Sequence, residues 1–293
     1  MNQIRIKAMA KVNLGLDVLR RLENGYHEVK MVMQTVDLYD ELTVVKEETK
    51  EITITSNAGE LPLNEDNLIY KAAKLLFQKA GNEYGVSIHL NKNIPIAAGM
   101  AGGSTDAAAT LLALNALFGF GYSKEELAEI GVKIGADVPY CIYGGTCLSE
   151  GIGEILTKLP DAPDCYIVIA KPPIGVSTKY VYENLHIETV QEHPDMDGMV
   201  EAIQKGSLKD VTDKMGNVLE TVTVKRYPEI AKMKQCLLDN GAENALMSGS
   251  GPTVFGIFTE RKTADKALKE LEKTGLVKQG FVTIFAKETG IME

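Results

Sequence analysis

The first sixty residues alternate between apolar and polar positions with the two-residue period of a half-buried β-strand. In the first run, Ile4, Ile6 and Ala8 fall on the same side. Asn24-Gly25, a dipeptide that favours hairpin turns, lies between two such runs. Strands joined by turns, without helices between them, indicate an antiparallel or mixed sheet. The expected strands cover residues 3–8, 12–18, 27–36, 41–46 and 51–56.

The period then changes to that of a helix. Apolar residues three and four positions apart predict a helix over 67–80, with Asp66 or Asn67 as its N-cap. Ser123, with Glu126 three residues later, has the pattern of a capping box and predicts the start of another helix. The other elements expected in this half are a strand over 86–90, a helix over 104–118, and strands over 141–149 and 153–158.

A short segment marked by prolines, residues 159–164, separates two halves of the chain. We therefore expect an N-terminal domain over 1–158 and a C-terminal domain over 159–293. In the second half helical patterns mix with short strands, which indicates helices packed on one sheet. Helices are expected over 177–184, 197–204, 208–222, 228–240 and 262–273, and strands over 166–170, 244–247, 253–258 and 279–285.

Composition and charge exclude several classes of protein. The 293 residues are 45% hydrophobic and 24% charged, which is typical of a globular protein. Forty acidic residues against 31 basic ones give a net charge of −9, which disfavours a nucleic-acid partner. The first eighteen residues carry charges throughout, and no apolar stretch reaches the ~18 residues of a spanning helix, so we expect no membrane partner and a cytoplasmic location. The four cysteines and four histidines have no zinc-binding spacing.

The strongest chemical signal is a run of small residues between an expected strand and an expected helix. Its backbone N–H groups can approach an anion closely, and the helix N-terminus adds the positive end of a dipole. The run has neither the Gly-Lys-Ser/Thr of a Walker A loop nor the spacing of Gly-x-Gly-x-x-Gly. The alternative is a tight strand-to-helix connection, and the run alone favours neither. Its residues are Pro95, Ile96, Ala97, Ala98, Gly99, Met100, Ala101, Gly102, Gly103, Ser104 and Thr105.

Three further features carry both a structural and a chemical interpretation. The glycine cluster over 248–256 is, by itself, more typical of a hairpin than of a binding loop. Asp137 follows an expected helix end, where it suits either a loop cap or a fixed general base; Val138, before Pro139, is biased toward extended backbone. Lys11 interrupts an apolar strand, where a lysine usually reaches solvent but can also hold a carboxylate ionised.

Together these segments resemble the GHMP kinase family, named for galactokinase, homoserine, mevalonate and phosphomevalonate kinases. The resemblance lies in residues 11–16, 95–105 and 249–255. Asn24-Gly25-Tyr26-His27 and Ile134-Gly135-Ala136-Asp137-Val138-Pro139 are similar to the members that act on a cytidine diphosphate-linked methylerythritol, in isoprenoid precursor synthesis. The resemblance covers essentially the whole chain.

This resemblance implies an α+β fold, with an N-terminal domain like domain 2 of ribosomal protein S5 and a ferredoxin-like C-terminal domain. It also implies that ATP, with Mg²⁺, phosphorylates the 2-hydroxyl of that small-molecule substrate in the cleft between the domains. Asp137 is then the general base, and Lys11 orients it and stabilises charge on the reacting oxygens. Ser104 or Thr105 is expected to contact Mg²⁺.

For ATP, the resemblance implies residues 95–105 around the phosphates, and Asn67 with Leu68 at the adenine. Asn67 suits a helix cap nearly as well. The chain departs from many members of the family at Ala101, where they have glycine, and at Asp106, where they have asparagine. A methyl group at position 101 is tolerable with a negative φ, and Asp106 is expected to turn away from the phosphates or to meet the metal.

For the cytidine group, the resemblance implies that Tyr26 stacks on the base and His27 forms a hydrogen bond to it. Tyr182 could complete the sandwich, but it could equally be a core tyrosine, and Tyr180 is its rival. Asn13 is expected to bind a phosphate or hydroxyl group of the substrate. We expect a monomer or a weak homodimer.

Three other functions compete with this one. Homoserine or mevalonate kinase would share the phosphate loop but would not need Tyr26 and His27. A non-catalytic nucleotide-binding module would not need Lys11 or Asp137. An RNA-binding protein with the S5-like fold is disfavoured by the acidic net charge.

Overall fold

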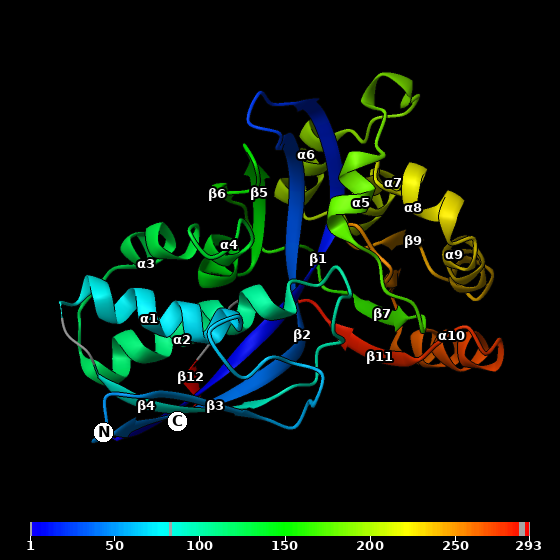
Figure 1. Cartoon of the computed structure of the whole chain (residues 1–293). Coiled ribbons are helices and arrows are strands. Elements are labelled where there is room, and N and C mark those ends of the chain that lie inside the picture. The colour runs from blue at the N-terminus through cyan, green and yellow to red at the C-terminus, as the bar shows by residue number, and fades with distance from the viewer. Residues whose placement is uncertain (1, 82–83, 287–290, 293) are drawn as a thin grey trace.

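The computed structural model describes residues 2–81, 84–286 and 291–292, and its strands form two sheets (Figure 1). The first sheet is built around two long antiparallel strands, β1 (Gln3–Arg21) and β2 (His27–Glu47). Its order is β12-β1-β2-β4-β3, in which β12 is Ile291–Met292, β4 is Gly85–Asn91 and β3 is Ile52–Ser56. Three more strands join it: β5 (Thr146–Glu150) pairs with β2 and with β6 (Ile155–Lys158), and β8 (Gly216–Asn217) pairs with β1.

The strands at the N-terminus are longer than the sequence pattern predicts. The runs 3–8 and 12–18 belong to the single strand β1, and the runs 27–36 and 41–46 belong to β2. The alternation breaks in the middle of β1 because residues 8–18 are all buried, so both faces of the strand are covered. The turn at Asn24-Gly25 is confirmed, since the Leu22 N–H donates to the Tyr26 carbonyl at 2.8 Å.

Helices of the N-terminal half cover one face of this sheet (Figure 1). They are α1 (Leu68–Lys79), α2 (Gly102–Phe118), α3 (Lys124–Gly131) and α4 (Val138–Tyr143). The predicted capping box is confirmed, since the Glu126 N–H donates to Ser123 Oγ and the Ser123 N–H donates to Glu126 Oε2. Buried alanines line α2, and their small side chains let the helix approach β1 and α1 closely.

The prediction of a strand over 141–149 is wrong in its first part. Residues up to Tyr143 belong to α4, and β5 begins only at Thr146. The segment is apolar and buried on all sides, and a short run of that kind does not separate strand from helix. The extended backbone expected at Val138 is also wrong, because Pro139 occupies the first turn of α4, where it needs no N–H partner.

The second sheet is antiparallel and has the order β11-β7-β10-β9, the arrangement of a ferredoxin-like domain (Figure 1). The helix expected over 208–222 is wrong, because Gly216 and Asn217 leave the helical path and pair with β1 as β8. The strands are β7 (Tyr166–Lys171), β9 (Asn244–Met247), β10 (Val254–Phe258) and β11 (Gln279–Ile284). The helices of this half are α5 (Thr178–Glu183), the 3-10 helix η1 (Ile187–Thr189), α6 (Met196–Lys205), α7 (Leu208–Asp213), α8 (Glu220–Arg226), α9 (Glu229–Asp239) and α10 (Arg261–Lys273).

The two halves of the chain share their apolar core. One buried cluster contains Leu14 from β1 together with Ile169 from β7, so side chains of both sheets pack in it. The first sheet also receives β8 and β12 from the C-terminal half. None of the helices that the structure describes is long and apolar enough to cross a membrane.

Candidate active site

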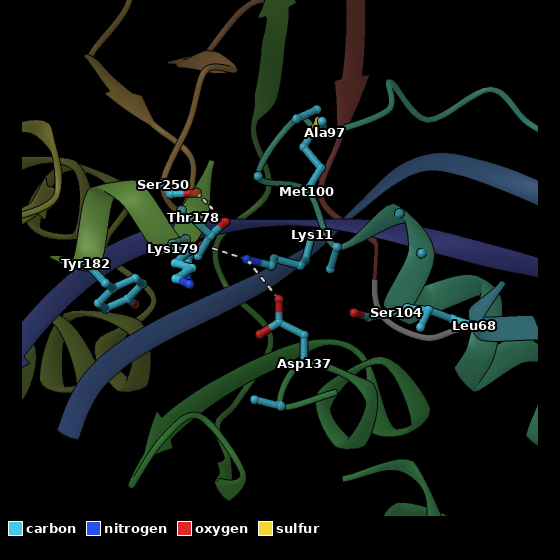
Figure 2. Close-up of a pocket in the computed structure, with 18 of the residues that line it drawn as sticks. Lys11, Leu68, Ala97, Met100, Ser104, Asp137, Thr178, Lys179, Tyr182 and Ser250 are labelled. Atoms are coloured by element: carbon cyan, nitrogen blue, oxygen red, sulfur yellow. Dashed lines mark hydrogen bonds and ion pairs between the residues drawn. The ribbon is translucent and has the colours of Figure 1, made fainter. Parts of the chain in front are cut away.

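A cavity of about 1020 Å³ brings nearly all of the expected site residues together (Figure 2). Its wall contains segments of both halves of the chain, including the start of β2, the loop before α2 and helix α5. Thr105 is the one expected site residue that does not line it. The expected residues that do are Lys11, Asn13, Tyr26, His27, Asn67, Leu68, Pro95, Ile96, Ala97, Ala98, Gly99, Met100, Ala101, Gly102, Gly103, Ser104, Asp137 and Tyr182.

Lys11 and Asp137 meet on one side of the cavity (Figure 2). The pairing of β1 with β2 shifts register between Met9 and Lys11, and such an irregularity changes where a side chain points. The Lys11 ammonium group is buried; it donates to Asn13 Oδ1 at 2.8 Å and lies 3.7 Å from Asp137 Oδ2. Lys11 therefore does not extend to solvent, and it holds a positive charge beside the carboxylate.

Asp137 lies at the N-terminus of α4, but its side chain caps no backbone N–H of that helix. The side chain is 33% exposed and lines the cavity. The hydrogen bond that a capping role of Asp137 would require is therefore not formed. A carboxylate that is open to a cavity and close to an ammonium group has the arrangement of a general base.

The loop over 95–101 turns sharply before α2. Gly99 has φ 71°, and two alanines also adopt positive φ, Ala97 at 51° and Ala101 at 57°. The negative φ that would make a methyl group at position 101 tolerable is not adopted, since Ala101 is the N-cap of α2 in the left-handed region. That conformation places residues 99–103 at the start of the helix, where free N–H groups and the helix dipole favour an anion.

The glycine cluster after β9 closes over this loop. It connects β9 to β10, as the hairpin interpretation predicts, but Gly249 and Ser250 also line the cavity. Ser248 Oγ donates to the Gly99 carbonyl at 2.9 Å. A Cβ atom at position 99 would collide with the Ser248 carbonyl, so only glycine allows the two loops to approach this closely.

The neighbouring residues Ser104 and Thr105 differ in their access to the cavity. Ser104 lines the cavity, whereas the Thr105 hydroxyl is fully buried and has no hydrogen-bond partner among the residues that the structure describes. Its polar neighbour is the thiol of Cys141, a weak hydrogen-bonding group. Thr105 is therefore a poor candidate for a ligand of phosphate or metal, and Ser104 remains the better one.

Asp106 is turned toward a lysine that the sequence did not single out. Lys92 Nζ lies 2.7 Å from Asp106 Oδ2 and 2.5 Å from Asp40 Oδ2. Burial raises the pKa of Asp106 well above its usual range, although the charge of Lys92 acts in the opposite direction. Asp106 is thus turned toward Lys92 within the protein, and the expectation that it might meet the metal has no support from this contact.

Aromatic side chains form the other end of the cavity. The rings of His27 and Tyr182 lie 5.1 Å apart, and Tyr26 next to them is 60% exposed. Burial, with a smaller effect of the charge on Asp137, raises the pKa of Tyr182, and burial followed by the charge of Arg21 lowers the pKa of His27.

The choice between Tyr180 and Tyr182 follows from their surroundings. Tyr182 lines the cavity, and Tyr180 does not. The hydroxyl of Tyr180 instead accepts a hydrogen bond from Arg226 Nη1 at 3.3 Å.

Asn67 has a structural role and also reaches the cavity. Its Oδ1 accepts from the Ile69 N–H at 2.9 Å, and its Nδ2 donates to the Pro62 carbonyl at 2.7 Å. It therefore caps α1, and together with Leu68 it lines the cavity beside the phosphate loop.

Several charged residues of the cavity were missed at the sequence level. They stand in no recognisable motif, and each looks like an ordinary surface residue in the sequence. Only the meeting of separate segments in one cavity identifies them: Arg21, Lys92, Lys179 and Glu183.

Comparison with known proteins identifies the family of the chain. The profile of the GHMP kinases N terminal domain matches residues 67–145, and that of the GHMP kinases C terminal domain matches residues 199–276. The chain belongs to the GHMP kinase family, whose members are ATP-dependent small-molecule kinases.

Within the family, the chain is similar to proteins named 4-diphosphocytidyl-2-C-methyl-D-erythritol kinase. It is 52% identical to the one from Lachnoclostridium phytofermentans, over 99% of this chain and 100% of that protein. It is 53% identical to the one from Lachnospira eligens, over 97% of this chain and 98% of that protein.

Solved structures give the same result. A crystal structure of 4-(cytidine 5'-diphospho)-2C-methyl-D-erythritol kinase superposes with a TM-score of 0.83 at 31% identity, covering 97% of this chain and 99% of that one. Homoserine kinase from Cytophaga hutchinsonii superposes with a TM-score of 0.82 at 22% identity, covering 100% and 98%. The second likeness shows the shared fold.

Proposed function

We propose that this chain transfers the γ-phosphoryl group of ATP to the 2-hydroxyl of 4-diphosphocytidyl-2-C-methyl-D-erythritol, an isoprenoid precursor. The observation that carries the proposal is the Lys11–Asp137 pair, which faces the same cavity as the phosphate loop and the aromatic end. The names of relatives that are about 50% identical over nearly the whole chain support the choice of acceptor.

The chemical step needs a base and a positive charge beside the reacting oxygen. Asp137 takes the proton of the 2-hydroxyl as that oxygen forms a bond to the γ-phosphorus, and the bond to the β-phosphate oxygen breaks to release ADP. The Lys11 ammonium group stabilises the negative charge that develops between the two oxygens. Asn13 accepts a hydrogen bond from Lys11 and so holds this ammonium group in place. Its side chain can also form a hydrogen bond to a hydroxyl or phosphate group of the acceptor.

The phosphates of ATP fit the N–H groups of residues 99–104 at the N-terminus of α2. Mg²⁺ in such sites is held mainly by phosphate oxygens and water, with few protein ligands, and it neutralises charge on the phosphates. The described residues contain no cluster of three or more His, Cys, Asp or Glu side chains for a metal. Ser104, whose side chain reaches the cavity, would hold Mg²⁺ together with the phosphates, and Asn67 and Leu68 would contact the adenine.

The aromatic end of the cavity supports a nucleobase in the acceptor. Tyr26 is exposed and free to stack on a pyrimidine, and His27 can form a hydrogen bond to the edge of that ring. Tyr182, on α5, would close the other face. Homoserine and mevalonate contain no nucleobase, so acceptors of that kind would leave the aromatic end of the cavity unused. The cytoplasmic location and the monomeric or weakly dimeric state stay predictions from the sequence.

A phosphorylation assay with parallel acceptors tests the proposal. Purified chain, ATP and Mg²⁺ are mixed with 4-diphosphocytidyl-2-C-methyl-D-erythritol, homoserine or mevalonate, and products are measured by mass spectrometry. We expect a mass increase of one phosphoryl group for the cytidine compound alone. Phosphorylation of homoserine or mevalonate in its place would contradict the proposed acceptor but leave the kinase class intact.

A further inference from the structure

Of the four lysine and arginine side chains that line the cavity in the described part of the chain, two already face carboxyl groups of the protein. Lys92 lies between the carboxylates of Asp40 and Asp106, at 2.5 and 2.7 Å. Lys11 is held by Asn13 and faces Asp137. Neither ammonium group is left over to balance a further anion at the aromatic end.

The other two basic side chains, Arg21 and Lys179, are weakly compensated. Among the described residues, Arg21 has no ion-pair partner. Lys179 Nζ lies 3.8 Å from Glu183 Oε1, but both side chains are largely exposed, and such a pair contributes little. The cavity therefore contains two positive charges that a bound anion could use.

Both residues flank the aromatic end of the cavity. Arg21 is the last residue of β1 and pairs across the strands with His27. Lys179 lies three residues before Tyr182 in α5, so the two side chains share one face of that helix. In Figure 2, Lys179 is drawn with Tyr182 on one side and the Lys11–Asp137 pair on the other.

We propose that Arg21 and Lys179 bind the diphosphate of the acceptor. The inference rests on the proposed function: with the base at Tyr182 and the reacting hydroxyl at Asp137, the diphosphate that links them passes Lys179. A diphosphate diester carries two negative charges, and two basic side chains balance them. The planar fork of an arginine suits two phosphate oxygens at once, and a lysine adds a mobile point charge.

This assignment makes the two residues determinants of specificity. Acceptors without a diphosphate, such as homoserine, gain nothing from these charges. Binding of the cytidine group and binding of the diphosphate are then separable, and the second is carried by residues outside the Lys11–Asp137 pair and the phosphate loop.

Calorimetric titration of the full chain with cytidine and with CDP tests the inference. A non-hydrolysable ATP analogue with Mg²⁺ is present at saturation, so that CDP cannot occupy the ATP phosphate loop. The variants are Arg21→Gln, Lys179→Gln and the double variant. Matched controls are Arg20→Gln, whose arginine pairs with Glu28 away from the cavity, and Lys205→Gln on α6.

We expect the wild type to bind CDP more tightly than cytidine, and this preference to fall by about tenfold or more in the double variant, the scale of lost charge-assisted hydrogen bonds. Affinity for cytidine should stay unchanged, and the controls should retain the preference. The salt dependence of CDP binding should also become weaker in the double variant.

Two results would overturn the inference, and they are distinguishable. A double variant that keeps the full preference for CDP would contradict the role of Arg21 and Lys179 alone. A wild type that binds neither cytidine nor CDP would contradict the proposed acceptor as well. Rescue of the preference by Arg21→Lys with Lys179→Arg would support a role of charge over a role in packing.

Discussion

Lys11 Nζ lies 3.7 Å from Asp137 Oδ2, close enough for an ion pair but beyond the usual length of a hydrogen bond. The Lys11 ammonium group donates a hydrogen bond to Asn13 Oδ1 at 2.8 Å. The ammonium group therefore places a positive charge beside the carboxylate at a distance longer than a direct hydrogen bond. This relationship leaves Asp137 available to accept a proton from a substrate hydroxyl.

Asp137→Asn should preserve folding and ATP binding but lower kcat by at least about 100-fold, the scale of one lost general base. Steady-state kinetics and titration with an ATP analogue measure the two effects. Asp164→Asn, in the linker between the sheets, is the matched control and should retain full turnover. Near-normal turnover in Asp137→Asn would remove Asp137 from the role of base.

Tyr26→Ala should weaken binding of the cytidine acceptor and leave the KM for ATP unchanged. Stacking of an aromatic side chain on a base contributes about 1–3 kcal/mol, so we expect KM for the acceptor to rise roughly tenfold or more. Tyr26→Phe keeps the ring and should retain most of the affinity. An unchanged KM in Tyr26→Ala would show that the base stacks elsewhere.

Ser104 and Thr105 should respond differently to loss of the hydroxyl group. Ser104→Ala removes a group that reaches the cavity, and the Mg²⁺ concentration needed for half-maximal activity should rise. Thr105→Val replaces a buried hydroxyl for which the described part of the chain offers no hydrogen-bond partner. The free energy of unfolding should therefore stay equal or rise by about 1 kcal/mol, with normal Mg²⁺ dependence. A shift of the Mg²⁺ dependence in Thr105→Val alone would reverse this assignment.

Ala101 and Gly99 both have positive φ but should not tolerate the same changes. An alanine in the left-handed region costs about 1–2 kcal/mol, and Ala101→Gly removes this cost. The greater conformational freedom of glycine in the unfolded chain offsets part of the gain in stability. We expect unchanged or slightly higher stability and normal activity. Thermal or denaturant unfolding, together with KM for ATP, measures both properties.

Gly99→Ala is the opposite case. The added methyl group collides with the Ser248 carbonyl, so we expect a loss of about 1–3 kcal/mol in the free energy of unfolding and a higher KM for ATP. A Gly99→Ala variant as stable and active as the wild type would show that the two loops separate without cost.

The order and type of most elements could be predicted from the sequence, because hydrophobic period and caps are local properties. Asn67 and Ser123 mark helix starts that the structure confirms. The errors fall where burial covers both sides of a segment, as in β1 and α4, so that no polar residue marks the boundary. They also fall where two residues pair with a strand that is distant in the sequence, as Gly216 and Asn217 pair with β1.

The candidate site, too, was predictable where its residues stand in local motifs and not where they meet through long-range contacts. Lys11, Asp137 and the loop over 95–104 stand in motifs, and the structure brings them to one cavity. Lys92, Arg21 and Lys179 come from unrelated segments, and only long-range packing shows what they face. The backbone at Ala101 could not be derived either, because tertiary contacts of the loop hold an alanine in a conformation that it adopts rarely alone.

The position of the transferred phosphoryl group decides whether this chain is a kinase of the tertiary 2-hydroxyl. Wild-type chain is incubated with ATP, Mg²⁺ and 4-diphosphocytidyl-2-C-methyl-D-erythritol, and the product is assigned by phosphorus and carbon NMR, with ADP measured in parallel. We expect one new phosphomonoester on the tertiary 2-hydroxyl for each ADP formed, and formation of this product at least about 100-fold slower in Asp137→Asn. A phosphoryl group on another hydroxyl, or ADP formed without phosphorylated acceptor, would contradict the proposed reaction.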